Sequence, residues 1–266
     1  MVFMLAVRVK NLWFSYGEEW VIKGVNLKIK QGELVSIIGP NGCGKTTLVK
    51  HFNGLLKPTK GKVFVKGIDT TQATTAELAR IVGYVFQNPN NQIFLNTIFD
   101  EVAFGPRNLG LQDVEELVFW SLKKLGLFKD TNKPPFLLSM GEKERLAIAS
   151  LLAMKPEILI LDEPTTGQDS NTCLKIVELM KELKEEGKTI ILISHDMEIV
   201  AEHSDKVIAM KKGKIVKEGK PEKIFSNFKL LEELSLYPPQ LFRVGKMLGL
   251  RKIPRSIEEF ARELRI

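Results

Sequence analysis

Residues 39–47, with the sequence GPNGCGKTT, constrain the fold of this 266-residue chain more than any other segment. They fit the pattern G-x-x-x-x-G-K-[ST], with Gly39, Gly44, Lys45 and Thr46 at its fixed positions. The apolar run ELVSIIG leads into this segment, and a helix-like stretch follows it. A buried strand, a glycine-rich loop and a helix in this order predict an α/β protein with a phosphate-binding loop.

The chemistry of this loop indicates a nucleoside triphosphate and Mg²⁺ as ligands. Its glycines let successive backbone N–H groups turn inward around phosphates, and the helix that begins near Lys45 adds its positive N-terminal dipole. We expect Lys45 to bridge the β- and γ-phosphates and the Thr46 hydroxyl to ligate Mg²⁺. A tight strand-to-helix turn without a ligand is the alternative. The residues expected to bind the nucleotide are Gly39, Pro40, Asn41, Gly42, Cys43, Gly44, Lys45, Thr46 and Thr47.

Two further segments, EILILDEP and TIILISHD, are nearly continuous aliphatic runs that end in polar residues, and a helix-like segment connects them. Strands of a parallel sheet that are buried on both faces have this composition, and their ligand residues lie at the carboxyl ends. KVFVKG and IVGYVFQ are interpreted as another strand pair, and a hairpin is expected to turn at Gly213. Residues 97–154 are predicted to be mainly helical, with boundaries at Gly105-Pro106 and Pro134-Pro135.

The polar residues at these strand ends are candidates for metal binding and hydrolysis. Asp162 is expected to be the second metal ligand, and Glu163, one residue further, to polarise a water in line with the γ-phosphate. His195 is expected to contact the γ-phosphate and that water. The alternatives are that the Asp-Glu pair is only a polar end of the strand before Pro164, and that His195 is a structural residue whose hydrogen bonds are made within the fold.

In this order, these motifs resemble the nucleotide-binding subunit of an ABC transporter over about residues 3–225. The resemblance implies a P-loop NTPase with a RecA-like mixed sheet core flanked by helices. It also implies an ABC-type ATPase domain at 1–225 that includes a helical subdomain at about 88–154, and a small C-terminal extension at 226–266. ATP and Mg²⁺ are the implied ligands, and ATP hydrolysis is the implied activity.

The resemblance assigns roles to residues outside the loop. Tyr16 stands 23 residues before Gly39, where the family stacks an aromatic side chain on adenine, although a core aromatic is the alternative. Gln87 falls where the family has the glutamine that senses Mg²⁺ and the attacking water. Asp169 falls where an aspartate couples the two halves of the ATPase dimer.

LSMGE, residues 138–142, falls where the family has its signature loop, usually LSGGQ. The resemblance implies that Ser139 and Gly141 contact the ATP held by a partner ATPase subunit. Ser139-x-x-Glu142 also fits a helix capping box. Met140 and Glu142 depart from the family pattern, and these departures would affect only the binding of the ATP that the partner holds. This asymmetry favours a heterodimer over a homodimer.

A narrower similarity involves YVFQNPNNQIF, DEVAFGPRNLGL and the Pro238-Pro239 element. These segments look like the ATPases of energy-coupling-factor (ECF) transporters, including the cobalt and nickel type, which import vitamins or transition-metal ions. The implied partners are a second ABC ATPase subunit, a transmembrane coupling subunit and a substrate-binding membrane subunit. Residues 88–137 are predicted to contact a membrane partner, and residues 226–266 are a possible dimer contact.

The composition agrees with a peripheral subunit on the cytoplasmic face of the membrane. No apolar run approaches the ~18 residues that span a bilayer, and we identify no secretion signal. Two cysteines and three histidines argue against a metal cluster or zinc site, and the formal charge of +7 is mild.

Soluble ABC ATPases that act on nucleic acid or ribosomes are an alternative class. However, only 51 residues separate Gln87 from Ser139, too few for a long coiled coil, and no base-stacking stripe is present. We expect no nucleic-acid partner. A P-loop kinase or GTPase would have no use for the signature loop.

Overall fold

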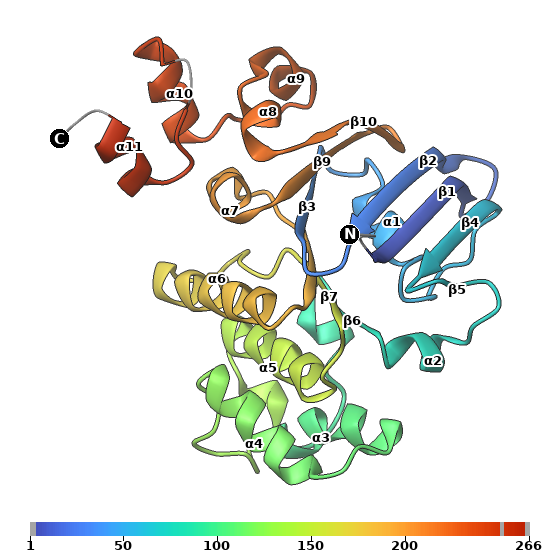
Figure 1. Cartoon of the computed structure of the whole chain (residues 1–266). Coiled ribbons are helices and arrows are strands. Elements are labelled where there is room, and N and C mark those ends of the chain that lie inside the picture. The colour runs from blue at the N-terminus through green and yellow to red at the C-terminus, as the bar shows by residue number, and fades with distance from the viewer. Residues whose placement is uncertain (1–3, 251–252, 264–266) are drawn as a thin grey trace.

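The computed structural model describes residues 4–250 and 253–263 of the chain. It contains a four-stranded and a six-stranded sheet, and most helices lie on the side of the larger sheet that faces away from the smaller one. In Figure 1 the smaller sheet lies to the right, a group of helices lies at the bottom, and the C-terminal helices lie at the upper left. This architecture confirms the predicted mixed α/β class.

The six-stranded sheet has the order β10-β9-β3-β8-β7-β6. Its parallel strands are β3 (Leu34–Ile38), β6 (Val82–Val85), β7 (Ile158–Asp162), β8 (Thr189–Ile193) and β9 (Lys206–Lys211). The antiparallel edge strand β10 (Lys214–Gly219) follows β9 through a turn at Gly213, which has φ 80°, so the predicted hairpin is confirmed. Every residue of β3, β7 and β8 is buried, as expected for strands covered on both faces.

The alternating side chains of these strands enter two separate cores. Val35 and Ile37 of β3 face a core that they share with α1 (Lys45–Val49) and the smaller sheet. That sheet has the order β2-β1-β4-β5, with β1 (Leu5–Ser15), β2 (Trp20–Lys30), β4 (Lys60–Val65) and β5 (Ile68–Asp69). Packing between the two sheets therefore holds the segment after β3 from both sides.

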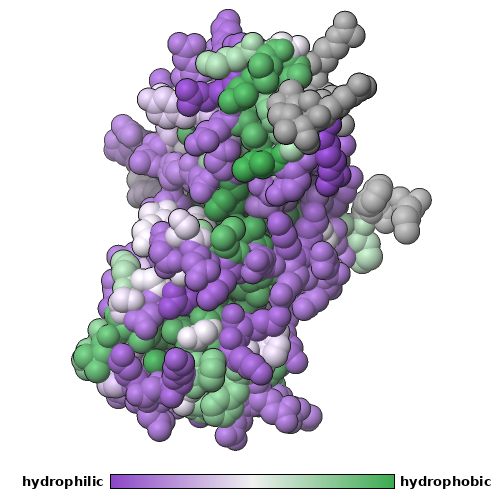
Figure 2. Space-filling model, turned by 90° about the vertical axis from the view of Figure 1, so that its left-hand side faces the viewer, coloured by the Kyte–Doolittle hydropathy of each residue, from purple (hydrophilic) through white to green (hydrophobic). Residues whose placement is uncertain are grey.

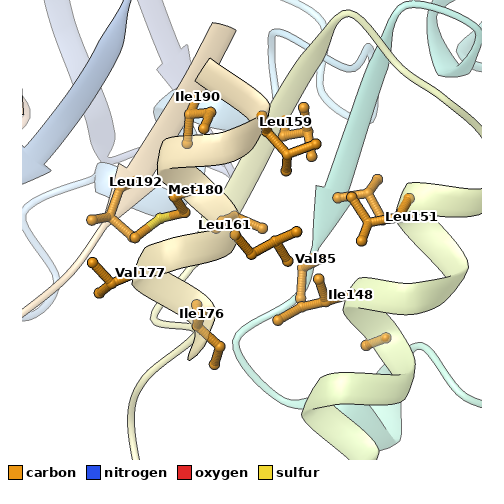
Figure 3. Close-up of a cluster of buried hydrophobic side chains, with 14 of the residues drawn as sticks. Val85, Ile148, Leu151, Leu159, Leu161, Ile176, Val177, Met180, Ile190 and Leu192 are labelled. Carbon is orange, nitrogen blue, oxygen red and sulfur yellow. The ribbon is translucent and has the colours of Figure 1, made fainter. Parts of the chain in front are cut away.

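The opposite face of the large sheet packs against α5 (Met140–Ala153) and α6 (Ser170–Glu185). In Figure 3, Leu159 and Leu161 of the sheet meet Ile148 and Leu151 of α5, while Met180 approaches from α6. Since β7 leads to Asp162 and α5 begins after Ser139, this core fixes the strand end and the start of the signature helix in one body.

The segment between β6 and β7 is mainly helical, as predicted. It contains α3 (Ile98–Leu109), α4 (Val114–Lys124) and α5, with short 3₁₀ turns at Pro89–Asn91 and Pro135–Leu137. The expected boundary at Gly105-Pro106 is wrong, because α3 continues through Pro106 to a left-handed cap at Gly110. Pro106 is buried, and Gly105 lies where a Cβ would be 2.5 Å from Cγ of Met154. Tertiary packing thus outweighs the local cost of proline in a helix.

KVFVKG and IVGYVFQ do form strands, but their predicted pairing is wrong. The first segment contains β4, which pairs with β1 and β5, whereas the second contains β6, which pairs with β7 in the other sheet. Between them lies α2 (Thr75–Ala79), which a Thr74–Glu77 capping box begins. That intervening helix carries the chain from one sheet to the other.

The described part of the C-terminal extension packs on the ATPase core. It contains α9 (Phe228–Glu233), α10 (Gln240–Met247) and α11 (Ile257–Glu263), it follows α8 (Pro221–Phe225), and it adjoins α7 (Met197–His203). Phe225 and Phe242 are fully buried, with ring centroids 5.6 Å apart, in the same core as α5 and α6. Among the described residues, no helix is long and apolar enough to cross a membrane.

Candidate functional site

The phosphate-binding loop leaves β3 at Ile38 and enters α1 at Lys45. Gly39 has φ 148°, and a Cβ there would lie 2.2 Å from the Met210 carbonyl oxygen of β9. Gly44, the N-cap of α1, has φ 105°, and a Cβ there would lie 2.9 Å from Cδ1 of Ile22. The backbone conformation therefore favours glycine at both positions, and at Gly39 the backbone oxygen also leaves no space for a side chain.

Lys45 lies inside the loop that it closes. Its ammonium donates hydrogen bonds to the carbonyl oxygens of Gly39 at 2.8 Å and Pro40 at 3.2 Å, and the residue is only 7% exposed. Cys43 is also buried, and burial raises the pKa of its thiol. Since the thiolate is the reactive form, the Cys43 side chain is a poor nucleophile and acts as a small apolar group.

The Asp162 carboxylate, at the end of β7, is held by two hydroxyl groups. Oδ2 accepts hydrogen bonds from Oγ1 of Thr46 at 2.8 Å and from the hydroxyl of Tyr84 at 2.9 Å. Burial raises the pKa of this carboxyl, against the lowering effect of the two hydrogen bonds. Oδ1 is buried and has no hydrogen-bond partner among the described residues.

Oδ1 of Asp162 and Oγ1 of Thr46 are therefore hard oxygen donors at one place, and one of them lacks a partner. This is the donor chemistry that Mg²⁺ prefers, with the remaining positions filled by water and phosphate oxygens. The residues fit the ion that the sequence predicted.

Glu163, one residue beyond the strand, is only 8% exposed and has the left-handed conformation, φ 57°. Its Oε1 lies 2.8 Å from Nε2 of His195, and its Oε2 accepts a hydrogen bond of 3.2 Å from Oγ1 of Thr166. The ends of β7 and β8 thus bring the predicted base and the predicted histidine into contact.

A cleft of about 250 Å³ lies over the loop. It is lined by Val21, Asn41, Gly42, Cys43, Gly44, Lys45, Thr46, Thr47, Gln87 and Glu163. The exposed Tyr16, which follows β1, borders this region because its hydroxyl lies 3.5 Å from Oγ1 of Thr47. The structure therefore brings together the loop and the predicted residues Tyr16, Gln87, Asp162, Glu163 and His195.

The signature residues Ser139 and Gly141 are not among those that line this cleft. They begin α5, where the predicted capping box is confirmed: Ser139 Oγ accepts from the Glu142 amide, and the Glu142 carboxylate accepts from the Ser139 amide. These hydrogen bonds hold the pKa of Glu142 below its usual range. Lys143 does not neutralise Glu142, since its ammonium donates to Oδ1 of Asn90 at 3.0 Å. The nearby charges that favour ionised Glu142 are those of Lys133 and Arg145.

Sequence reasoning missed two residues near the site. Tyr84, which donates to Asp162, lies on β6, beside β7 in the sheet, and the sequence alone did not reveal that adjacency. Gln168 donates to the buried Glu144 of α5, and its side-chain oxygen lies 2.7 Å from where a Cβ of Gly141 would be. Gln168 thus ties the segment after Glu163 to the signature helix. Asp169 itself caps α6 by accepting from the Thr172 amide.

Comparisons with known proteins identify the family of this chain. The ABC transporter domain family matches residues 22–166. A putative ABC transporter ATP-binding protein of Pyrococcus furiosus is 48% identical over 96% of this chain and 98% of its own length. The energy-coupling factor transporter ATP-binding protein EcfA of Methanocaldococcus jannaschii is 46% identical over 92% of this chain and 90% of its own. The solved structure of cbiO1 from Clostridium perfringens has a TM-score of 0.76 and 35% identity, covering 92% of this chain and 99% of that one.

With half the chain inside the family match and relatives similar along nearly its whole length, this chain belongs to the ATP-binding subunits of ABC transporters. It is an ATP-binding, ATP-hydrolysing subunit with a P-loop NTPase fold.

Proposed function

We propose that this chain powers an ECF-type importer of a vitamin or transition-metal ion from the cytoplasmic face of the membrane. The similarity to EcfA supports this proposal, as does that to cbiO1, which is described as part of the ABC transporter complex cbiONQ. Both similarities cover 92% of this chain, so they extend beyond the ATPase domain into the C-terminal extension.

ATP would bind with its phosphates in the loop and its adenine on Tyr16. The backbone N–H groups and the N-terminus of α1 favour the phosphate charge, and the Lys45 ammonium would exchange its carbonyl partners for phosphate oxygens. Tyr16 is 63% exposed beside Thr47, so its ring is accessible for stacking, while Phe14 packs against it in a T-shaped contact. Mg²⁺, held through Thr46 and Asp162 with Gln87 beside it, would neutralise charge on the phosphates.

Glu163 would act as the general base for the attacking water. Its carboxylate is held by His195 and Thr166, so it is oriented before the water arrives. His195 would contact the γ-phosphate. Gln87 lines the same cleft as Glu163, and it would couple the presence of the γ-phosphate to the conformation of the residues that follow it.

The second wall of the ATP site would come from a partner ATPase subunit. Ser139 and Gly141 are presented at the start of α5, away from the residues that line the chain's own cleft. Closing a dimer from about 1% to 99% needs roughly 5.5 kcal/mol of differential binding. A charge-assisted hydrogen bond contributes about 1.5–3 kcal/mol, so two such donors at each of two sites suffice. Hydrolysis would remove the bridging phosphate and open the dimer.

A membrane partner would dock where residues 88–106 border an apolar groove. The groove, of about 240 Å³, lies between β6, α3 and α5, and its walls include Phe86, Phe94, Phe104 and Met154. Phe94 is 62% and Phe104 45% exposed, so both rings are available to a short apolar helix of the coupling subunit. Phe86 precedes Gln87, which links this groove to the nucleotide cleft.

Site-specific crosslinking in the assembled membrane complex tests this proposal. A photocrosslinker at position 94 or 104 should capture a transmembrane subunit, whereas one at position 216 on β10 should not. The proteins that co-purify from detergent-solubilised membranes would identify that subunit and reveal whether the second ATPase is a different chain, as we propose. Crosslinks from position 94 only to ribosomal components or DNA would contradict the transport function.

A further inference from the structure

The C-terminal extension holds both ends of α7, the short helix that follows His195. At its first turn, the backbone amide of Gln240, the first residue of α10, donates a hydrogen bond of 2.7 Å to Oε1 of Glu198. At its other end, the guanidinium of Arg255 donates from Nε to the Ala201 carbonyl at 2.8 Å, and also from Nη2 to the Ser204 carbonyl. The described residues thus include three hydrogen bonds from the extension to α7 and its C-cap, Ser204.

Arg255 suits this position chemically. The last carbonyls of a helix have no intrahelical partners and carry partial negative charge, so a forked cation satisfies two of them and favours the dipole. Its Nη1 also lies 3.6 Å from Oε1 of Glu222 on α8. Packing supports the arrangement: Phe242 of α10 is fully buried, and a Cβ at Gly245 would lie 2.9 Å from side-chain carbons of Ile253.

The short connection between α7 and the nucleotide site makes this clamp relevant to hydrolysis. His195 precedes the N-cap Asp196, whose side chain accepts from the amides of Glu198 and Ile199, and whose own amide donates to Ser194 Oγ. Val200 and Ala201 are buried in the core, so α7 has little freedom while both ends are held. A displacement of α7 would pass through Asp196 to the His195 ring, 2.8 Å from Glu163.

We infer that the C-terminal extension positions His195 by clamping α7, with Arg255 as the principal positioning residue. The extension is then an input to ATP hydrolysis in its own subunit, in addition to any contact that it makes with a partner. A partner that pulls on the extension would change the turnover rate of ATP without touching the nucleotide. This inference rests on the proposed catalytic roles of Glu163 and His195.

Arg255→Ala tests the clamp in the full chain, within the complex recovered from membranes. We expect kcat for ATP to fall about tenfold. A catalytic group that is misplaced by about 1 Å can lose about 100-fold in rate, so a smaller displacement of His195 suffices for this loss. The affinity for ATP should change less than about twofold, because the phosphates and the adenine contact elements other than α7. Arg255→Lys, which keeps the charge but loses the forked geometry, should give an intermediate kcat. The matched control is Arg243→Ala on the exposed face of α10, which should leave kcat unchanged.

A double-mutant cycle separates positioning from a general loss of structure. If Arg255 acts through His195, adding Arg255→Ala to His195→Ala should lower kcat no further than His195→Ala alone. Additive losses, an equal loss in Arg243→Ala, or a normal kcat in Arg255→Ala would each overturn the clamp. If His195→Ala itself keeps normal turnover, this result contradicts the proposed catalytic role of His195, on which the inference about the extension rests. Should Arg255→Ala fail to fold, Glu198→Ala removes the other end of the clamp and should reduce kcat with ATP affinity retained, whereas Glu198→Gln, which keeps an acceptor oxygen, should not.

Discussion

Glu163 adopts a backbone conformation that a non-glycine residue rarely takes. Its φ of 57° costs free energy, which the surrounding contacts offset. Its amide donates to the Ile193 carbonyl at 2.8 Å, and its carboxylate meets His195 and Thr166. The left-handed turn moves the side chain from the sheet toward the cleft over the loop. Backbone strain and three contacts thus place one carboxylate where the proposed general base must stand.

Glu163→Gln removes the proposed general base and keeps the shape of the side chain. The amide can still contact His195 and Thr166, so ATP should bind with normal affinity while turnover falls about 100- to 10,000-fold, the usual contribution of general acid–base catalysis. Without hydrolysis, the ATP-bound dimer should accumulate. Phosphate release and gel filtration with ATP and Mg²⁺ measure the two effects. Turnover within a few-fold of the wild type would exclude Glu163 as the base.

At the scale of elements, the start of α5 serves helix stability and proposed ATP contact at once. Glu142 accepts from both the amide and the hydroxyl of Ser139, which keeps it ionised near the phosphate that Ser139 should touch. Glu142→Gln keeps an acceptor oxygen for the cap but removes the charge. The negative charge of Glu142 opposes the negative phosphate at this helix N-terminus, and such a charge is worth about 0.3–1 kcal/mol. Without it, half-maximal ATP-dependent dimerisation should need about two- to fivefold less ATP.

The control for this prediction is Glu115→Gln, in the exposed first turn of α4, which should leave the dimerisation curve unchanged. Light scattering or analytical ultracentrifugation over an ATP titration gives the midpoint. A midpoint that moves to higher ATP would mean that Glu142 helps the partner site instead of weakening it.

The sequence predicted the elements whose signals are local. The glycine loop, the aliphatic strands, the Ser139–Glu142 capping box and the turn at Gly213 all follow from neighbouring residues. The failures involve contacts between distant residues. Burial of Pro106 carries α3 past its expected end, β4 and β6 join different sheets, and Tyr84 reaches Asp162 only because β6 and β7 are adjacent. No local pattern encodes these tertiary neighbours.

At the scale of the whole molecule, a buried histidine makes stability depend on pH. His51 is fully buried, its Nδ1 lies 2.7 Å from the Thr47 carbonyl oxygen, and burial lowers its pKa to about 4. The unfolded chain, with a histidine pKa of about 6.5, binds the extra proton first as the pH falls. The stability due to neutral His51 is therefore complete above about pH 6.5 and is lost toward pH 4, at about 1.4 kcal/mol per pH unit.

His51→Asn should remove this part of the pH dependence, because the asparagine amide can donate to Thr47 but does not titrate. Urea unfolding at pH 4.5, 5.5 and 6.5 measures the slope of the unfolding free energy for both proteins. His203, whose pKa burial and the charges of Lys181 and Arg255 lower to about 4, keeps its own contribution in both. Equal slopes in the two proteins would contradict the prediction, whatever the variant's absolute stability.

The exposed apolar face of α10 is the part of the molecule that best fits the proposed dimer contact of the extension. Val244, Met247 and Leu248 are 42%, 81% and 55% exposed. In Figure 2 apolar side chains lie at the end of the molecule that carries the extension, along the middle of this face and at its lower end. Because Met247 is so exposed, Met247→Glu should cost the single subunit little stability. If the face is buried between subunits, the charge should weaken dimer association about tenfold or more.

Phe128→Glu, at a 51% exposed aromatic residue between α4 and the Pro135–Leu137 turn, is the matched control, and it should leave association unchanged. Sedimentation without nucleotide isolates the contact, because no ATP then bridges the subunits. Met247→Glu should also leave kcat of the ATP-closed dimer near normal, since the clamp on α7 uses Gln240 and Arg255. Unchanged association in Met247→Glu would remove this face from the interface and leave the hold on α7 as the remaining proposed role of the extension.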